Sequence, residues 1–331
     1  MTAGSLVAAA GIALIGQVRT TWQMFAVFVL FGTGYAFAGL VPTTSLVTRW
    51  FHRRRSLALA IASTGLSMGG IAITPLLAQL IEKRSLVSLA PWFAVAYLAG
   101  IIPIVWLLLR VSPESMGLRP DGDAPAFDEP DDVVLPGTSF ALAVRSGYFK
   151  IVSVGFVILM SAQVGALQHL FKLTKDRIDI DAASLALIVV TATSVVGRIA
   201  GGLAAMRFPL MRLVSVLAVV QAIGIAIIAV SDSIGMILLG CVVLGSAMGN
   251  LLMLHPLLLA DAFGVRDYSR IYGLGALLMV FGVGLGPFNV GILRDATDYR
   301  TAFLAMAALA LVGLAVLRLA PAPPTPDSGP H

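Results

Sequence analysis

Thr191, Ser194 and Arg198 follow one another at steps of three and four residues inside a long apolar stretch. At 3.6 residues per turn, this spacing places all three on one face of an α-helix. An arginine at the centre of a membrane-spanning helix costs about 2.5–3.5 kcal/mol on insertion scales, so we expect it to face a cavity and meet an anion there. Its planar guanidinium can donate two hydrogen bonds to one carboxylate, which lysine cannot reproduce. A structural alternative has Arg198 extending to the membrane surface or holding neighbouring carbonyl groups.

Three further polar residues within apolar stretches, Gln163, Asn250 and Tyr35, are predicted to line the same cavity. The predicted substrate-binding set therefore joins these three to Arg198, Thr191 and Ser194. The sequence contains no nucleophile triad, no phosphate-binding glycine loop and no metal-ligand cluster. We therefore expect neither an enzyme nor an ATP-driven pump, and no metal or cofactor.

The elements that must position these residues are membrane-spanning helices. Hydrophobic residues make up 58% of the chain and charged residues only 12%, whereas about 25% of a soluble domain is charged. Each apolar block approaches the roughly 20 residues that a helix needs to cross the bilayer. Because lipid offers no partners for backbone groups, blocks of this length predict an all-α membrane helix bundle. Ten blocks are predicted, at 2–18, 22–47, 56–81, 91–110, 148–171, 184–206, 212–230, 234–260, 271–293 and 300–319.

A basic cluster, RWFHRRR at residues 49–55, separates the second and third blocks. Trp50 and Phe51 end one block and Ser56 begins the next, so we interpret the cluster as an interfacial anchor and not as a nucleic-acid-binding patch. Thirteen of the 22 Lys and Arg residues fall on one set of alternate loops and eight on the other, with Arg198 inside a helix. The richer side is expected to be cytoplasmic, which places both termini inside the cell at the inner or plasma membrane.

The only long polar stretch divides the helices into two groups. Its five prolines and acidic residues predict a cytoplasmic linker at 111–146, between an N-terminal half at 1–110 and a C-terminal half at 147–319. The first half holds four predicted spans and the second six. The proline-rich residues 320–331 predict a disordered tail.

The two halves resemble each other. Pro42 and Pro75 in the first half recur as Pro256 and Pro287 in the second, at offsets of 214 and 212 residues. Two such halves in the same orientation predict a pseudo-symmetric transporter. Small residues on one helix face predict close packing of backbones, as for Gly275, Gly282 and Gly286, and for the pairs Gly65/Gly69 and Gly245/Gly249.

Two motifs resemble the major facilitator superfamily, and within it the monocarboxylate and oxalate/formate type. RWFHRRRSLALAIASTGLSMGG is similar to the family's segment before and within helix five, and GRIAGGLAAMRF to its loop after helix eight. The resemblance implies that two halves rock around a central site, with an arginine of helix eight at the position of Arg198. It departs from the family where Met206 replaces an aspartate and where the segment 272–293 holds no cation. The residues that carry the two motifs are Arg49, Trp50, Phe51, Arg54, Arg55, Gly197, Gly202 and Arg207.

The family has twelve helices with the linker after the sixth, whereas here the linker follows the fourth block. The resemblance therefore predicts that family helices one and two are missing. Either the start codon has been assigned too late or the chain is a remnant.

These features predict a secondary active transporter, a symporter or antiporter that moves a small organic anion by alternating access. A monocarboxylate is the favoured substrate, and a coupling proton is left open. We expect a monomer in the lipid bilayer with no nucleic-acid partner. The alternative is a truncated or degenerate membrane protein of the same fold, a sensor or remnant subunit without transport activity.

Overall fold

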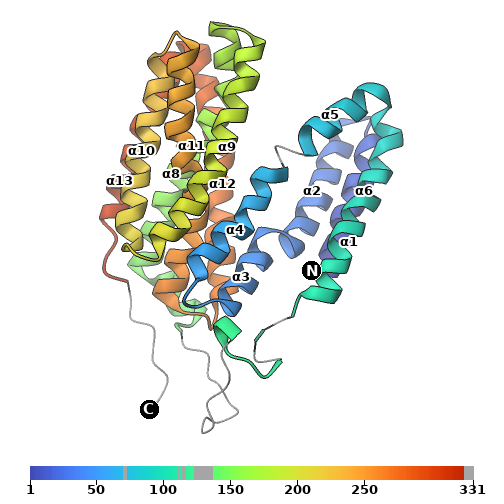
Figure 1. Ribbon diagram of the computed structural model, residues 1–331, viewed down its shortest axis with the longest axis vertical. Coiled ribbons are helices and arrows are strands. Elements are labelled where there is room, and N and C mark those ends of the chain that lie inside the picture. The colour runs from blue at the N-terminus through green and yellow to red at the C-terminus, as the bar shows by residue number, and fades with distance from the viewer. Residues whose placement is uncertain (70–72, 111, 114–115, 123–136, 324–331) are drawn as a thin grey trace. The chain divides into compact units, whose positions relative to one another are not determined.

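The computed structural model describes residues 1–69, 73–110, 112–113, 116–122 and 137–323, and these residues are almost entirely helical (Figure 1). Among them there is no strand, and only one isolated bridge joins Gly137 to Gly264. The all-α prediction is therefore confirmed. Most of the predicted tail and the central part of the predicted linker lie outside the described residues.

The helices form two units, which we describe separately. Unit 1 comprises Met1–His52 and Met68–Pro130, and unit 2 comprises Arg53–Ser67 and Asp131–His331. The helical elements of unit 1 are α1 (Thr2–Leu14), η1 (Ile15–Gln17), α2 (Thr21–Ala38), α3 (Leu40–Trp50), α5 (Thr74–Lys83), α6 (Leu86–Pro103), η3 (Ile104–Leu108) and η5 (Pro120–Gly122). Those of unit 2 are α4 (Arg55–Met68, apart from its last residue), α7 (Phe140–Arg145), α8 (Gly147–Arg177), α9 (Ile180–Ala205), α10 (Leu210–Val230), α11 (Ile234–Phe263), α12 (Tyr268–Ala296) and α13 (Tyr299–Arg318).

Every predicted apolar block contains helix. Eight helical segments in the described part of the chain are long and apolar enough to cross a membrane: Thr21–Trp50, Leu86–Leu107, Gly147–Arg177, Ile180–Ala205, Leu210–Val230, Ile234–Phe263, Tyr268–Ala296 and Tyr299–Arg318. The first block forms the shorter apolar helix Thr2–Gln17. The third block forms α4 and α5, which flank the undescribed residues 70–72.

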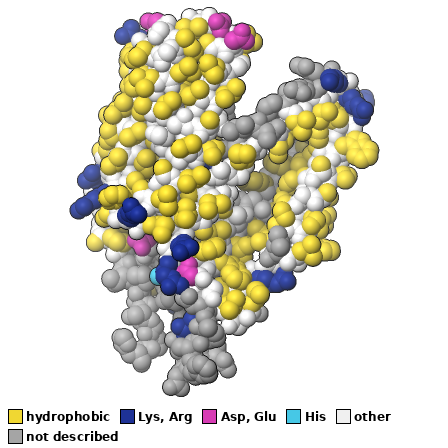
Figure 2. All heavy atoms as spheres, in the orientation of Figure 1, with side chains coloured by type: hydrophobic (Ala, Val, Ile, Leu, Met, Phe, Trp, Pro, Cys, Tyr) yellow, Lys and Arg dark blue, Asp and Glu magenta, His cyan; other side chains and the backbone are white. Residues whose placement is uncertain are grey.

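Apolar side chains cover the flanks of the helices in each unit, while charged side chains gather near the helix ends (Figure 2). On α9, for example, Ile188 and Val196 are 61% and 68% exposed. Surfaces of this kind are unfavourable in water and favourable against lipid chains. The distribution agrees with a protein whose helices cross a bilayer.

Three of the six long helices of unit 2, α8, α9 and α13, begin at a residue whose side chain caps the helix. Asp179 accepts a hydrogen bond from the Ala182 N–H at 2.7 Å at the start of α9, and Ser146 accepts one from the Phe149 N–H at 3.1 Å at the start of α8. Asp298 caps α13 through the Thr301 N–H at 2.7 Å, and this hydrogen bond lowers the pKa of the Asp298 carboxyl. Each cap satisfies a backbone donor that the first helical turn leaves without a partner.

Glycines bring the backbones of unit 2 into direct contact. A Cβ atom on Gly282 or Gly286 of α12 would overlap the backbone carbonyl oxygens of Val157 or Ser161 on α8. A Cβ atom on Gly245 of α11 would lie 2.6 Å from the carbonyl oxygen of Val190 on α9. The α8–α12 and α9–α11 pairs are therefore packed too closely at these points to admit a side chain.

The last part of the predicted linker packs on unit 2. The Phe140 N–H donates to the Asp267 carboxylate at 2.9 Å, and the Thr138 N–H donates to the carbonyl oxygen of Phe263 at 2.9 Å. Residues 137–146, which include α7, are thus held by the turn between α11 and α12. The sequence predicted a single linker over 111–146, whereas its last residues pack on unit 2. FALAVR offers apolar side chains that can pack, unlike the acidic residues before it.

Arg177 of α8 holds the end of α10. Its Nη1 donates to the carbonyl oxygens of Ser231 at 2.7 Å and Ile228 at 3.0 Å, and its Nη2 donates to that of Ala229 at 2.9 Å. The last carbonyl groups of a helix lack partners within their own helix, so a cation that binds several of them stabilises both the helix end and its position.

Arg177→Ala is therefore expected to lower the free energy of unfolding by about 1.5–3 kcal/mol. Thermal unfolding of the purified chain in detergent measures the effect as a lower Tm. Lys175→Ala, which removes an exposed cation from the same last turn of α8, is the matched control and should change Tm little. Equal shifts in the two variants would mean that the three hydrogen bonds contribute nothing.

Candidate functional site

Arg198 is a buried cation on α9, only 4% exposed. Its Nε donates to the carbonyl oxygen of Gly249 on α11 at 3.2 Å, and its Nη1 donates to the carbonyl oxygen of Ser63 on α4. Lys172–Asp176 and Arg294–Asp295 are ion pairs of the described residues, and neither involves Arg198. Carbonyl dipoles satisfy its hydrogen bonds, but a full positive charge in this interior has no carboxylate to balance it within the described chain.

Asn250 of α11 and Arg198 of α9 each donate a hydrogen bond to the backbone of the other's helix. The Asn250 Nδ2 donates to the carbonyl oxygen of Gly197 at 2.9 Å, while Arg198 donates to that of Gly249. Each side chain thus binds the carbonyl of the residue that precedes the other, and we call this pair of contacts the α9–α11 clasp. Asn250 is 1% exposed, with its Oδ1 against Gly201 and without a hydrogen-bond partner among the described residues. A role for Asn250 in lining a substrate cavity stays a prediction.

Thr191 and Ser194 share the helix of Arg198, but their hydroxyl groups bind their own backbone. Thr191 donates to the carbonyl oxygen of Leu187 at 2.7 Å, and Ser194 donates to that of Thr191 at 3.0 Å. Ser194 is fully buried, and its carbonyl oxygen lies in close contact with Gly249. Both hydroxyl groups keep lone pairs that can accept a hydrogen bond.

Gln163 and Tyr35 are not joined to this group by any described contact. Gln163 of α8 is 6% exposed, and its Oε1 lacks a hydrogen-bond partner in the described part of the structure. Tyr35 of α2 belongs to unit 1, where its ring stacks on Phe31 with centroids 6.2 Å apart. For both residues, a role in substrate binding stays a prediction.

The residues of the two loop motifs lie at helix ends or at contacts between helices. In unit 1, Arg49 lies in the last turn of α3 and Phe51 follows it, while the Trp50 Nε1 donates to the carbonyl oxygen of Arg110 at 3.1 Å. In unit 2, Gly197 faces the backbone of Ser246 on α11, and Gly202 faces Ala60 of α4. Arg54 and Arg55 lie at the start of α4, and Arg207 follows the end of α9.

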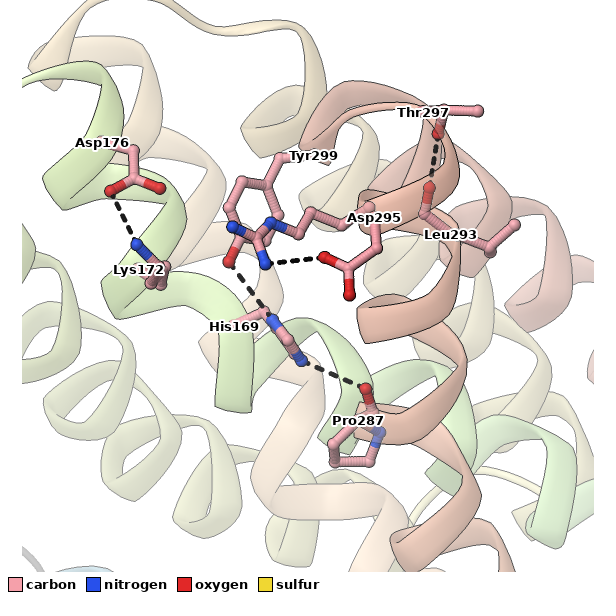
Figure 3. A network of polar contacts seen from close by, with 9 residues as sticks. His169, Lys172, Asp176, Pro287, Leu293, Asp295, Thr297 and Tyr299 are labelled. Carbon is pink, nitrogen blue, oxygen red and sulfur yellow. Dashed lines mark hydrogen bonds and ion pairs between the residues drawn. The ribbon is translucent and has the colours of Figure 1, made fainter.

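A second polar group, shown in Figure 3, lies where α8, α12 and α13 meet. His169 of α8 places Nε2 3.1 Å from the carbonyl oxygen of Pro287 on α12 and Nδ1 3.4 Å from the hydroxyl of Tyr299 on α13. We call His169, Pro287 and Tyr299 the three-helix junction. The sequence carries no signal for it, because the three residues are far apart in the chain. For metals, the described residues hold no group of three or more His, Cys, Asp and Glu side chains placed to bind an ion.

Long apolar helices, closely packed bundles and a buried cation in one of them are features of multi-pass membrane transporters, and comparison with known proteins supports this class. The sequence profile described as Major Facilitator Superfamily matches residues 1–254 and 138–331. The chain therefore belongs to the Major Facilitator Superfamily. The relatives and structural neighbours described next are transporters and not enzymes.

Two relatives illustrate the similarity in sequence. The chain is 27% identical to monocarboxylate transporter 13 of Bos taurus, over 96% of this chain and 72% of that protein. It is 28% identical to human monocarboxylate transporter 11, over 86% of this chain and 60% of that protein.

Two solved structures share the fold. The human organic anion transporter MFSD10 (TETRAN) matches with a TM-score of 0.73 at 15% identity, over 96% of this chain and 76% of its own. The Escherichia coli fucose:proton symporter FucP (N162A) matches with a TM-score of 0.66 at 17% identity, over 97% of this chain and 82% of its own. At these identities the two structures support the fold and nothing finer.

Proposed function

We propose that this chain is a secondary transporter of small organic anions, with a monocarboxylate as the favoured substrate, and that Arg198 binds the carboxylate. The observation that carries the proposal is the uncompensated charge of Arg198, which is buried in a membrane-spanning helix with carbonyl partners only. An anion supplies the missing countercharge. The names of the relatives, monocarboxylate transporters 13 and 11, favour the same substrate class.

The hydrogen bond from Arg198 to Ser63 suggests how an anion is accepted. The Ser63 carbonyl is neutral, whereas a carboxylate carries a full negative charge and can accept two hydrogen bonds from a guanidinium, so it competes well against the Ser63 carbonyl for Nη1. The bond from Nε to Gly249 meanwhile fixes the guanidinium on α9 and α11. Exchange of the Ser63 carbonyl for a carboxylate would release α4 from α9, and in this superfamily the two halves move against each other around a central site.

Binding can be tested apart from transport by thermal unfolding of the purified chain in detergent. Lactate, pyruvate, formate and oxalate are added in turn, and lactamide serves as the uncharged match for lactate. A ligand at 100 times its Kd stabilises the folded state by about 2.7 kcal/mol, which raises Tm. We expect at least one anion to raise Tm and lactamide to leave it unchanged. Equal effects of lactate and lactamide would count against recognition of the charge.

Asn250→Asp is expected to weaken anion binding at neutral pH by about tenfold or more, a loss of about 1.4 kcal/mol. The new carboxylate lies in the α9–α11 clasp beside Arg198 and supplies the countercharge that the substrate otherwise brings. The anion-induced rise in Tm at neutral pH, compared between the wild type and the variant, reports the effect.

Gln221→Glu is the matched control for Asn250→Asp. Gln221 is a fully buried amide on α10 whose Nε2 donates to the carbonyl oxygen of Leu159 at 3.1 Å, with no described contact to Arg198. Gln221→Glu should therefore not weaken anion binding in the same way. If both variants weaken anion binding equally, a carboxylate beside Arg198 has no specific effect.

A further inference from the structure

A pocket in unit 1 opens at the ends of two candidate membrane spans, Thr21–Trp50 and Leu86–Leu107. Its volume is about 220 Å³. Four apolar side chains, one indole and one arginine line it: Leu46, Val47, Phe51, Leu109, Trp50 and Arg110. Because both spans end beside the pocket, it lies at the level where the hydrocarbon core of a bilayer meets the lipid headgroups.

Trp50 joins the two walls of this pocket. Its Nε1 donates to the carbonyl oxygen of Arg110 at 3.1 Å, across 60 positions of the chain. Tryptophan is enriched at membrane interfaces, where its ring lies against lipid and its N–H finds a polar partner. Here that partner is the backbone of the second wall, so the hydrogen bond fixes the end of α3 beside Leu109 and Arg110.

Arg110 is the charged residue of the pocket, and it is exposed. Its Nη1 donates to the carbonyl oxygens of Leu109 at 3.2 Å and Trp106 at 3.4 Å, which keeps the guanidinium at the end of its own helix. Within the described part of the chain, Arg110 has no carboxylate partner. The Asp121 carboxylate accepts from the His52 N–H at 3.3 Å and does not line the pocket. An external anion can therefore bind the guanidinium without displacing a described acid.

We propose that this pocket binds an anionic phospholipid, with the headgroup phosphate on Arg110 and the first part of an acyl chain against the apolar lining. A guanidinium can donate two hydrogen bonds to one phosphate group. The apolar lining gives an acyl chain a surface that a free anion cannot use. The site does not depend on the transported substrate or on Arg198.

The location of the pocket agrees with a lipid of this charge. The positive-inside count predicts that this end of unit 1 faces the cytoplasm, and the cytoplasmic leaflet carries the anionic lipids. The basic cluster at residues 49–55 begins one residue before Trp50 and adds attraction to an anionic surface. Charge and chain complementarity thus favour an anionic phospholipid over a zwitterionic one.

Quenching of Trp50 fluorescence by brominated lipids tests the proposal at the pocket itself. The chain has four tryptophans, so Trp50 becomes the single emitter when the other three are replaced: Trp22→Phe, Trp92→Phe and Trp106→Phe. This full-length protein is reconstituted into phosphatidylcholine liposomes that contain brominated phosphatidylglycerol or, at the same fraction, brominated phosphatidylcholine. We expect an apparent affinity about fivefold higher for phosphatidylglycerol, the factor that one arginine beside an anionic surface contributes. Equal quenching by the two lipids would overturn the proposal.

Arg110→Gln should abolish the preference for phosphatidylglycerol. Arg84→Gln is the matched control, because Arg84 is an exposed arginine of unit 1 that precedes α6, at the end opposite to the pocket. It should keep the preference. A preference that persists in a folded Arg110→Gln protein would overturn the proposal.

Inorganic phosphate, exchanged for chloride at constant ionic strength, should leave the preference unchanged because it lacks acyl chains. Loss of the preference in phosphate would assign the pocket to a free anion and also overturn the proposal. The chain with all four tryptophans gives a second measurement that does not depend on the replacements. In detergent, phosphatidylglycerol should raise its Tm more than phosphatidylcholine does, and Arg110→Gln should remove the difference. Equal Tm values with the two lipids would contradict the proposed site.

Discussion

Arg198→Gln is expected to reduce kcat/KM for anion uptake by about two orders of magnitude or more. Removing one partner of a buried charge pair costs about 2–5 kcal/mol, and glutamine has the donors but not the charge. Arg198→Lys keeps the charge and loses the planar fork, so we expect a smaller loss of about tenfold. Initial rates of uptake into liposomes, measured over a range of substrate concentrations, give both values.

The control for this series is Arg212→Gln, which removes an exposed arginine at the start of α10. It should leave kcat/KM unchanged. Arg198 also holds Gly249 and Ser63, so the Tm of each variant separates a loss of binding from a loss of folding. Undiminished uptake by a folded Arg198→Gln protein would remove Arg198 from the substrate site.

Gly282→Ala should be among the most damaging single substitutions in unit 2. The added methyl group would overlap the backbone carbonyl of Val157, and backbone atoms of two packed helices cannot move aside cheaply. We expect a loss of about 3 kcal/mol or more, at the upper end of the range for overpacked cores. Thermal unfolding and the yield of monodisperse protein in detergent measure it.

Gly284→Ala is the matched control on the same helix. Its Cβ atom meets no described atom within 4 Å, and alanine is the better helix former by up to about 1 kcal/mol. Its stability should be equal to that of the wild type or higher. If Gly282→Ala and Gly284→Ala are equally stable, the close approach of α8 and α12 is not as described.

Local features of the fold were predictable from the sequence because they depend on neighbours in the chain. The length and composition of the apolar blocks predicted the helices. Aspartate, as at Asp179 and Asp298, is a residue type favoured at the N-cap of a helix. The shared face of Gly282 and Gly286 predicted a packing seam, and the structure confirms it against α8. The pair Gly245/Gly249 likewise packs on α9.

Other features depend on which helices become neighbours, and the sequence does not contain this information in readable form. Gly65 and Gly69 have the same spacing as Gly245 and Gly249, yet no described atom lies within 4 Å of a Cβ atom placed on either. The hydrogen bond from Asn250 to the Gly197 carbonyl joins positions 53 residues apart, and no pattern in the sequence predicts it. The partners of His169 are more than 100 residues away along the chain.

Transport itself is the most direct test of the proposed function. The full-length chain is reconstituted into liposomes, and uptake of labelled lactate, pyruvate, formate and oxalate is compared with that of labelled fucose as an uncharged solute. We predict saturable uptake of at least one anion, abolished by Arg198→Gln, and no uptake of fucose. Binding of an anion without uptake would indicate the non-transporting alternative. Uptake of fucose with none of the four anions would contradict the proposal that this chain carries organic anions.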